Sequence, residues 1–289
     1  LLGDSFMQAL QVGYDSTTGA LLERDLTKTL GRLVSVWNAG VDGWDPDQYL
    51  IRARQLLARR SYDAAVVTIY VDNDIIARRR ERVPARKNAE RHAFHVPRGF
   101  SKSDFIDAVL YPLNDYLDVR SHLYVLMKHS FDTILLKMGL SATDFPLVVQ
   151  RVAAGRPMWD LTAKICADLS AAGAQHHVPV IFAIIPAPYQ VDSTTFNYYV
   201  RGFSLDPRAM DIDQPQRIFD QELTKYGLRF VDVLPAFRAR AHLGKPLYGH
   251  VDRHLTPLGH EMLASQIMGV LPAAIEGADA GRVATPSKP

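Results

Sequence analysis

The sequence predicts an α/β protein, a three-layer α/β/α sandwich around a mainly parallel sheet of about five strands. Apolar runs rich in β-branched residues alternate with segments of helical periodicity, and this alternation is typical of doubly wound folds. The runs are nearly continuous in apolar character, as expected for parallel strands that helices cover on both faces. The predicted strands are Leu1–Gly3, Leu33–Trp37, Ala64–Tyr70, Val178–Ile185 and Arg229–Val233.

Helices are predicted between these strands from apolar spacing and from end signals. Thr17–Leu30 has leucines at helical spacing and is followed by Gly31, a typical C-terminal stop. Asp45 and Pro46 suit the N-cap and the first position of a helix that ends near Arg60. The other predicted helices are Met158–Ala172, Pro215–Tyr226 and Pro257–Val270, the last with Thr256 as its N-cap.

The length suggests one α/β/α unit with a large insertion. We expect residues 1–76 and 161–271 to form the unit, and residues 77–160 to form a mostly helical insertion. The insertion follows the carboxyl end of a strand, so it can form a lid over a site there. Its basic cluster at residues 78–91 is either a solvated face or a docking patch for an anionic polymer or membrane surface. We expect residues 272–289, rich in small residues, to form a flexible tail.

Composition excludes several classes of protein. The 33 basic and 31 acidic side chains leave a formal charge of +2, which argues against a dedicated nucleic-acid binder. The single Cys166 forms no internal disulfide and no multi-cysteine metal site. No apolar run reaches the roughly 18 residues that a membrane span requires. Because the sequence opens on Leu1-Leu2-Gly3, which suits the end of a buried strand, we expect it to be cut from a longer protein.

Small and polar residues follow the predicted strands, where ligands bind in open α/β sheets. Ser5, after the first strand, suits a nucleophile, and His254, after the fifth, suits its general base. Asp252 is the carboxylate that could orient the imidazole. The backbone N–H of Gly40, after the second strand, and the amide of Asn73, after the third, are candidate donors of an oxyanion hole.

Four blocks carry a family resemblance: Gly3-Asp4-Ser5-Phe6, Asn38-Ala39-Gly40, Asn73-Asp74, and Asp252 with His254. In this order the blocks resemble those of the SGNH (GDSL-type) hydrolase superfamily. The third block departs from the family pattern, because Val71 stands where the family usually has Gly. The last block has the spacing Asp-x-His instead of Asp-x-x-His, and it resembles a branch linked to bacterial exopolysaccharide acetylation.

The resemblance implies a serine esterase that cleaves or transfers O-acyl groups, with O-acetyl on a carbohydrate as the expected substrate. It implies an acyl-Ser5 intermediate, an oxyanion hole formed by Ser5, Gly40 and Asn73, and no metal or organic cofactor. Two alternatives stay open: a carbohydrate O-acetyltransferase instead of a hydrolase, or a non-catalytic glycan-binding domain. The branch also implies a location in the bacterial periplasm or cell envelope.

Several neighbours of the blocks have two interpretations. Asp4 and Asp74 suit structural carboxylates of the loops, or substrate-binding groups at the rim. Trp44 could stack on a sugar or pack in the interior, and His250 could line the site or lie in a plain loop. His260 is expected to be a structural residue of the last helix. Four aromatic residues after the fourth strand suit either a substrate wall or a packed core: Phe196, Tyr198, Tyr199 and Phe203.

Overall fold

The structure is a computed structural model that describes residues 1–75, 117, 120–121, 123–124, 127, 149, 156–202, 206–249 and 253–283. The chain divides into two compact units. The first comprises Leu1–Arg79, Pro146–Tyr199 and Asp206–Pro289, and the second comprises Arg80–Phe145 with Val200–Leu205. Most of the second unit lies outside the described residues, as does the basic cluster at residues 78–91.

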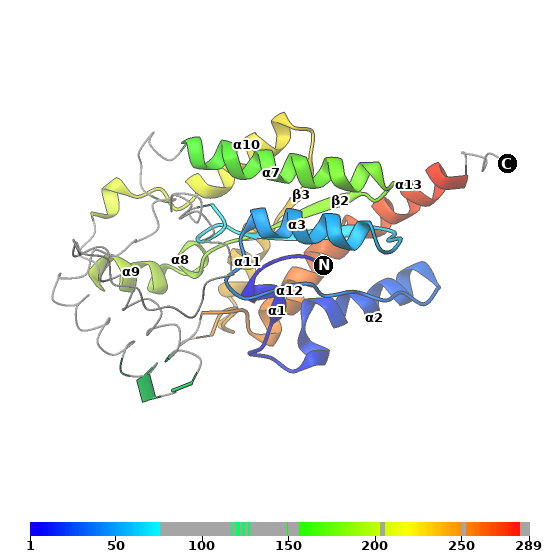
Figure 1. The fold of residues 1–289 in the computed structure, drawn as a ribbon. Helices are drawn as coiled ribbons and strands as arrows, with labels where there is room; N and C mark the ends of the chain where they lie inside the picture. The colour runs from blue at the N-terminus through cyan, green and yellow to red at the C-terminus, as the bar shows by residue number, and fades with distance from the viewer. Residues whose placement is uncertain are drawn as a thin grey trace, which may run out of the picture. The chain divides into compact units, whose positions relative to one another are not determined.

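A parallel sheet of three strands forms the centre of this unit, in the order β1 (Ala65–Tyr70), β2 (Val180–Ile185) and β3 (Arg229–Asp232). Every residue of the central strand β2 is buried, which explains its continuous apolar sequence. Helices lie on both sides of the sheet (Figure 1). The predicted α/β class with a parallel sheet is therefore confirmed, although the described sheet has three strands instead of about five.

The N-terminal segment extends the sheet beside β1 as an isolated bridge. Leu2 N–H donates to Val66 O at 2.8 Å, and Leu2 O accepts the Thr68 N–H at 2.9 Å. On the other side of this segment, Ala39 N–H donates to Leu1 O at 2.9 Å. The turn that follows residue 3 is therefore held between β1 and the stretch that contains Ala39.

The predicted strand Leu33–Trp37 is wrong. Its backbone bonds to side chains of the helix α2 (Thr18–Leu30): Val34 N–H donates to Thr27 Oγ1, and Val36 N–H donates to Glu23 Oε2. An apolar cavity of about 410 Å³ is lined by residues 32–37, by leucines of α2 and by the first half of β1. Because helix side chains satisfy these N–H groups, the stretch stays extended without joining the sheet.

The predicted helices are confirmed, and three of them begin directly after a capping residue. Thr17 caps α2, Asp45 and Gln48 form a capping box on α3, and Thr256 caps α12. The remaining bounds are α1 Ser5–Gln8, η1 Tyr14–Ser16, α3 Pro46–Leu57, α7 Arg156–Gln175, α8 Pro188–Val191, α9 Ser193–Gly202, η6 Pro207–Ala209, α10 Gln214–Lys225, α11 Leu234–Ala241, α12 Pro257–Met268 and α13 Leu271–Val283.

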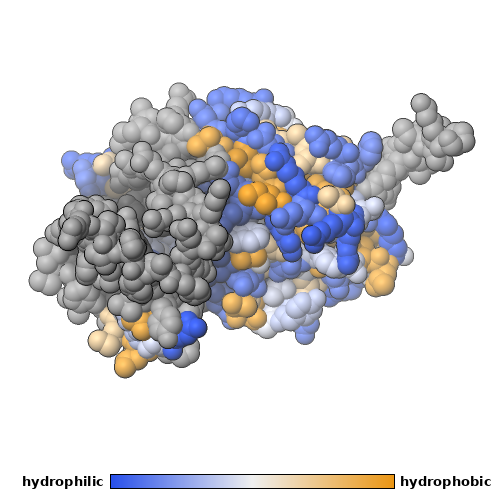
Figure 2. Space-filling model, in the orientation of Figure 1, coloured by the Kyte–Doolittle hydropathy of each residue, from blue (hydrophilic) through white to orange (hydrophobic). Residues whose placement is uncertain are grey.

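The helices form the two outer layers. On one side α7 contacts α3 and α10, and on the other α12 contacts α2 and α13 (Figure 1). The face that carries α3 and α7 shows apolar side chains among hydrophilic ones (Figure 2), and Ile51 and Leu161 are exposed on these helices. None of the described helices is long and apolar enough to cross a membrane.

The C-terminal segment differs from the flexible tail expected from residue 272 onward. It continues as the helix α13 up to Val283, and residues 284–289 lie outside the described residues. Leu271, Ala274 and Ile275 are buried and pack in the same core cluster as Leu22 of α2. The alanines that suggested a loose tail are strong helix formers, and the buried side chains of the first turns hold the helix on the core.

Candidate active site

Ser5 lies at the first position of α1, immediately after the segment that pairs with β1. Asp4 is the N-cap of this short helix, and its Oδ1 accepts the Phe6 N–H at 2.9 Å. A first helical residue has no acceptor for its N–H within its own helix. The Ser5 N–H has no hydrogen-bond partner in the described part of the chain. The turn therefore presents a hydroxyl and an open backbone donor from the same residue.

His254 contacts Ser5 directly, although 249 positions separate them: its Nε2 lies 2.8 Å from Ser5 Oγ. The histidine lies just before α12, in a stretch whose backbone pairs with residues 247–249. Gly249 N–H donates to His254 O at 2.8 Å, and Leu255 bridges Tyr248 in antiparallel fashion. The buried ring of Phe6 lies 5.0 Å from the imidazole, centroid to centroid. The structure thus brings together the predicted nucleophile and the predicted base.

Asn73 joins this pair through Asp4. Its Nδ2 donates to Asp4 Oδ2 at 3.0 Å, which leaves the second N–H of the amide for another acceptor. Asp4 is 1% exposed, and burial raises the pKa of its carboxyl. The hydrogen bonds from Asn73 and Phe6 and the charge of His254 act in the opposite direction on this pKa. Asp4 therefore serves as the structural carboxylate that the sequence suggested.

Gly40 packs against the backbone of α1. A Cβ at this position would lie 2.6 Å from Gln8 N and from Met7 Cβ, so only glycine fits. The Gly40 N–H donates to Asn38 Oδ1 at 3.0 Å. Of the three predicted oxyanion donors, Ser5 and Asn73 have open N–H groups, whereas the N–H of Gly40 is already bonded to the Asn38 side chain.

Asp74 is buried and holds the turn after β1. Its Oδ2 accepts the Tyr70 N–H at 2.8 Å, and its Oδ1 accepts the Tyr49 hydroxyl at 3.0 Å. Burial raises its pKa well above the ordinary value. Both oxygens of Asp74 therefore bond to groups of the protein, as its structural interpretation requires. Val71, which departs from the family pattern, extends the pairing of β1, because its N–H donates to Ile185 O at 3.1 Å.

The remaining predicted residues divide into three cases. Asp252 and His250 lie outside the described residues. Trp44 is half-buried, and its carbonyl accepts the Tyr49 hydroxyl at 3.2 Å; no contact among the described residues joins its ring to Ser5 or to His254. His260 is buried in α12, where its Nδ1 lies 2.9 Å from Thr18 Oγ1, as expected for a structural residue.

Sequence reasoning missed a polar and aromatic group beside the site. The hydroxyl of Tyr189 donates to Asp72 Oδ1 at 3.1 Å, and the guanidinium of Arg253 lies over the ring of Tyr199. These charged residues could have been found from their place in the sequence, because Asp72 directly precedes Asn73 and Arg253 directly precedes His254. Tyr199, one of the four aromatic residues expected after the fourth strand, is 6% exposed and packs on Tyr189.

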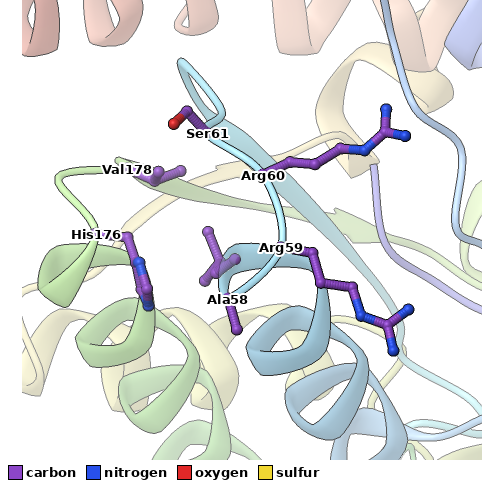
Figure 3. A pocket seen from close by; sticks show the side chains of 7 residues that line it. Ala58, Arg59, Arg60, Ser61, His176 and Val178 are labelled. Atoms are coloured by element: carbon purple, nitrogen blue, oxygen red, sulfur yellow. The ribbon is translucent and has the colours of Figure 1, made fainter.

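A second serine and a second histidine, Ser61 and His176, line different sides of a pocket of about 360 Å³ (Figure 3). Ser61 precedes β1 and His176 precedes β2, so this pocket lies at the amino ends of the strands. No hydrogen bond joins these two described side chains, so the pocket lacks the geometry of a nucleophile and its base. No group of three potential metal ligands occurs among the described His, Cys, Asp and Glu residues.

No family model and no curated protein sequence matches the chain. Solved structures to which the chain is similar include TesA, with 14% identity, a TM-score of 0.47 and coverage of 94% of this chain and 97% of that one. The acetyl xylan esterase AlAXEase is 15% identical, with a TM-score of 0.46 and coverage of 93% and 96%. A catalytic mutant of the acetylxylan esterase Axe2 from Geobacillus stearothermophilus is 14% identical, with a TM-score of 0.48 and coverage of 95% and 91%.

Proposed function

We propose that the chain is a serine esterase of the SGNH type that acts on O-acyl groups, with O-acetyl on a carbohydrate as the substrate. The observation that carries this proposal is the 2.8 Å contact between Ser5 Oγ and His254 Nε2, made at a helix start with an open Ser5 N–H. A serine within hydrogen-bonding reach of a histidine is the arrangement that activates a weak nucleophile. The acetyl and carbohydrate parts of the proposal rest on the family resemblance.

In the first half of the reaction, Ser5 Oγ bonds to the carbonyl carbon of the ester while its proton passes to His254 Nε2. The carbonyl oxygen becomes an oxyanion, which accepts hydrogen bonds from the Ser5 N–H and from the free N–H of the Asn73 amide. Collapse of this intermediate breaks the bond to the alcohol oxygen, which leaves with the proton from Nε2. The product is an acyl-Ser5 ester.

In the second half, water or a sugar hydroxyl attacks the acyl-Ser5 carbonyl and gives its proton to Nε2. The bond to Ser5 Oγ then breaks, and Oγ recovers the proton. The proposed role of Asp252 is to accept a hydrogen bond from the Nδ1–H of His254 and to stabilise the imidazolium. Gly40 would contribute a third oxyanion bond if its N–H turns from Asn38 Oδ1 to the oxyanion. The acceptor alone separates hydrolysis from acyl transfer, because both use the same residues.

The test combines labelling with turnover. A fluorophosphonate probe should label the wild-type chain at Ser5, and 4-nitrophenyl acetate should be hydrolysed. Ser5→Ala should lose both signals, and His254→Ala should lose turnover, while each variant keeps the wild-type melting temperature. Full activity in Ser5→Ala would refute the proposal. Absence of labelling together with measurable glycan binding would support the non-catalytic alternative. An acetylated oligosaccharide product, formed when an acetyl donor and an acceptor are supplied together, would identify a transferase.

A further inference from the structure

Two charged side chains stand next to the reacting groups and take no part in the mechanism above. Asp72 precedes Asn73, and Arg253 precedes His254. Because consecutive Cα atoms lie about 3.8 Å apart, the backbone of both residues lies beside the site. Arg253 is exposed and Asp72 is half-buried. A substrate at this rim therefore meets one cation and one carboxylate.

Buried tyrosines hold both side chains in place. Tyr189 in α8 donates its hydroxyl to Asp72 Oδ1 at 3.1 Å, and the Arg253 Cζ lies 4.5 Å from the ring centroid of Tyr199 in α9. The two rings meet edge to face with centroids 5.4 Å apart. They are 1% and 6% exposed, so they form part of the core. We call these four residues the Asp72–Arg253 cluster.

The backbone of Arg253 also points to a positioned side chain. Its φ of 60° lies in the left-handed region, which non-glycine residues seldom adopt without support from their surroundings. The guanidinium that lies over Tyr199 retains N–H donors for a ligand, because a cation–π contact does not occupy them as hydrogen bonds. Arg253 makes no ion pair within 4 Å with any other described residue.

The two charged residues of the cluster carry charges of opposite sign. Burial raises the pKa of Asp72 to about 6, whereas the Tyr189 hydrogen bond and the charge of Arg253 act to lower it. At pH 7.5 to 8 Asp72 is therefore mainly a carboxylate beside a permanent cation. A guanidinium only donates hydrogen bonds and a carboxylate only accepts them. A hydroxyl group can do both, so neighbouring hydroxyls on one ligand satisfy both side chains.

We propose that the Asp72–Arg253 cluster binds the alcohol side of the ester and selects uncharged polyhydroxy alcohols, such as a sugar ring, over alcohols that carry a carboxylate. This inference rests on the proposed function. His254 returns its proton to the leaving alcohol oxygen, so the alcohol lies on the side of the site where Arg253 adjoins His254. Neighbouring hydroxyls can bond to Arg253 and to Asp72 together, whereas a carboxylate only accepts hydrogen bonds, so it can bond to Arg253 but not to Asp72, whose charge repels it.

The test compares kcat/KM for three acetates at pH 8: 4-nitrophenyl acetate, a mono-acetylated methyl glucoside and the matching acetylated methyl glucuronide. The variants are Asp72→Asn, which keeps an oxygen for Tyr189, and Arg253→Asn, because Asn tolerates left-handed backbone. Each variant should lower the ratio of glucoside to 4-nitrophenyl activity about tenfold, since one hydrogen bond to a charged group is lost. Asp168→Asn and Arg24→Asn, at exposed sites on α7 and α2, are the matched controls.

The glucuronide separates this inference from a general structural effect. Its activity relative to the glucoside should rise in Asp72→Asn, which loses the repelling charge, and fall in Arg253→Asn, which loses the attracting one. Equal losses on all three substrates, or a change in the same direction in both variants, would overturn the inference. If the wild-type chain neither turns over 4-nitrophenyl acetate nor reacts with a fluorophosphonate, the proposed function itself fails.

Discussion

The Asp4 carboxylate connects the turn that carries Ser5 to Asn73, because its Oδ1 accepts the Phe6 N–H at 2.9 Å and its Oδ2 accepts the Asn73 amide at 3.0 Å. One buried side chain therefore sets the distance between the proposed nucleophile and a proposed oxyanion donor. Asp4 directly precedes Ser5, so any shift of the carboxylate also moves the helix start. A change at Asp4 should therefore displace both Asn73 and Ser5.

Removal of the Asn73 amide should lower kcat on 4-nitrophenyl acetate by about 10²–10³-fold, the usual cost of one oxyanion donor. Asp4→Asn should also lower kcat, because Phe6 and Asn73 bond to different oxygens of Asp4, and the amide of Asn would place an NH2 donor against one of these two N–H groups. If Asp4 acts through Asn73, the fold-reduction in kcat for the double variant Asp4→Asn and Asn73→Ala should be smaller than the product of the fold-reductions in the two single variants. Fully multiplicative losses would show that Asp4 acts independently.

Gly40→Ala should lower both stability and kcat. The new methyl group would lie 2.6 Å from Gln8 N and from Met7 Cβ, so α1 must move, and Ser5 moves with it. Overpacking of this kind costs about 1–3 kcal/mol, measured as the free energy of unfolding in urea. Gly13→Ala is the matched control, because nothing lies within 4 Å of a Cβ there and its φ is −63°. Wild-type stability and turnover in Gly40→Ala would contradict the packing described for this block.

His260 should make the fold sensitive to mild acid. Burial and the neighbouring His254 lower the pKa of His260 from 6.5 to about 4. Between these values the unfolded chain binds the proton first, so the contribution of His260 to stability declines as the pH falls from 6.5 to 4. This difference amounts to about 2 kcal/mol at pH 5 relative to pH 8.

His260→Gln keeps a partner for Thr18 and does not titrate. The free energy of unfolding of both chains is measured in urea at pH 8 and at pH 5. The wild-type value minus the variant value should therefore be smaller at pH 5 than at pH 8. A difference that stays constant over this range would mean that His260 titrates normally in the fold.

Asp220 should destabilise the fold in mild alkali. Its carboxyl lies in α10, its Oδ1 is buried, and no hydrogen-bond partner for this oxygen occurs among the described residues. Burial and the negative charge of Asp232 raise its pKa to about 7. Between pH 4 and 7 the folded chain keeps this proton while the unfolded chain releases it, so the stability associated with the proton declines as the pH rises from about 4 and is fully lost once the pH has passed about 7.

Asp220→Asn should therefore raise the melting temperature at pH 8, and the gain should shrink by pH 5. The exposed Asp168→Asn is a control without a buried oxygen. An equal gain at both pH values would show that the effect of Asp220→Asn does not come from ionisation.

Most of the helices and strands, and the pair of residues at the centre of the site, could be predicted from local patterns in the chain. Capping residues such as Thr17 and Asp45 act over one helical turn, so the helix starts could be read locally. Ser5 and His254 could be paired because polar residues after parallel strands gather at one edge of the sheet.

Features that depend on contacts between distant segments could not be predicted in this way. Leu33–Trp37 has the composition of a strand, but Thr27 and Glu23 of α2 take the N–H groups of Val34 and Val36. Leu271, Ala274 and Ile275 turn an expected tail into a helix, because they are buried in the core cluster. The Asp72–Arg253 cluster, likewise, forms from four separate segments of the chain. Local patterns indicate the conformational propensity of a segment, whereas the partner of each backbone or charged group depends on which distant segments the fold brings near it.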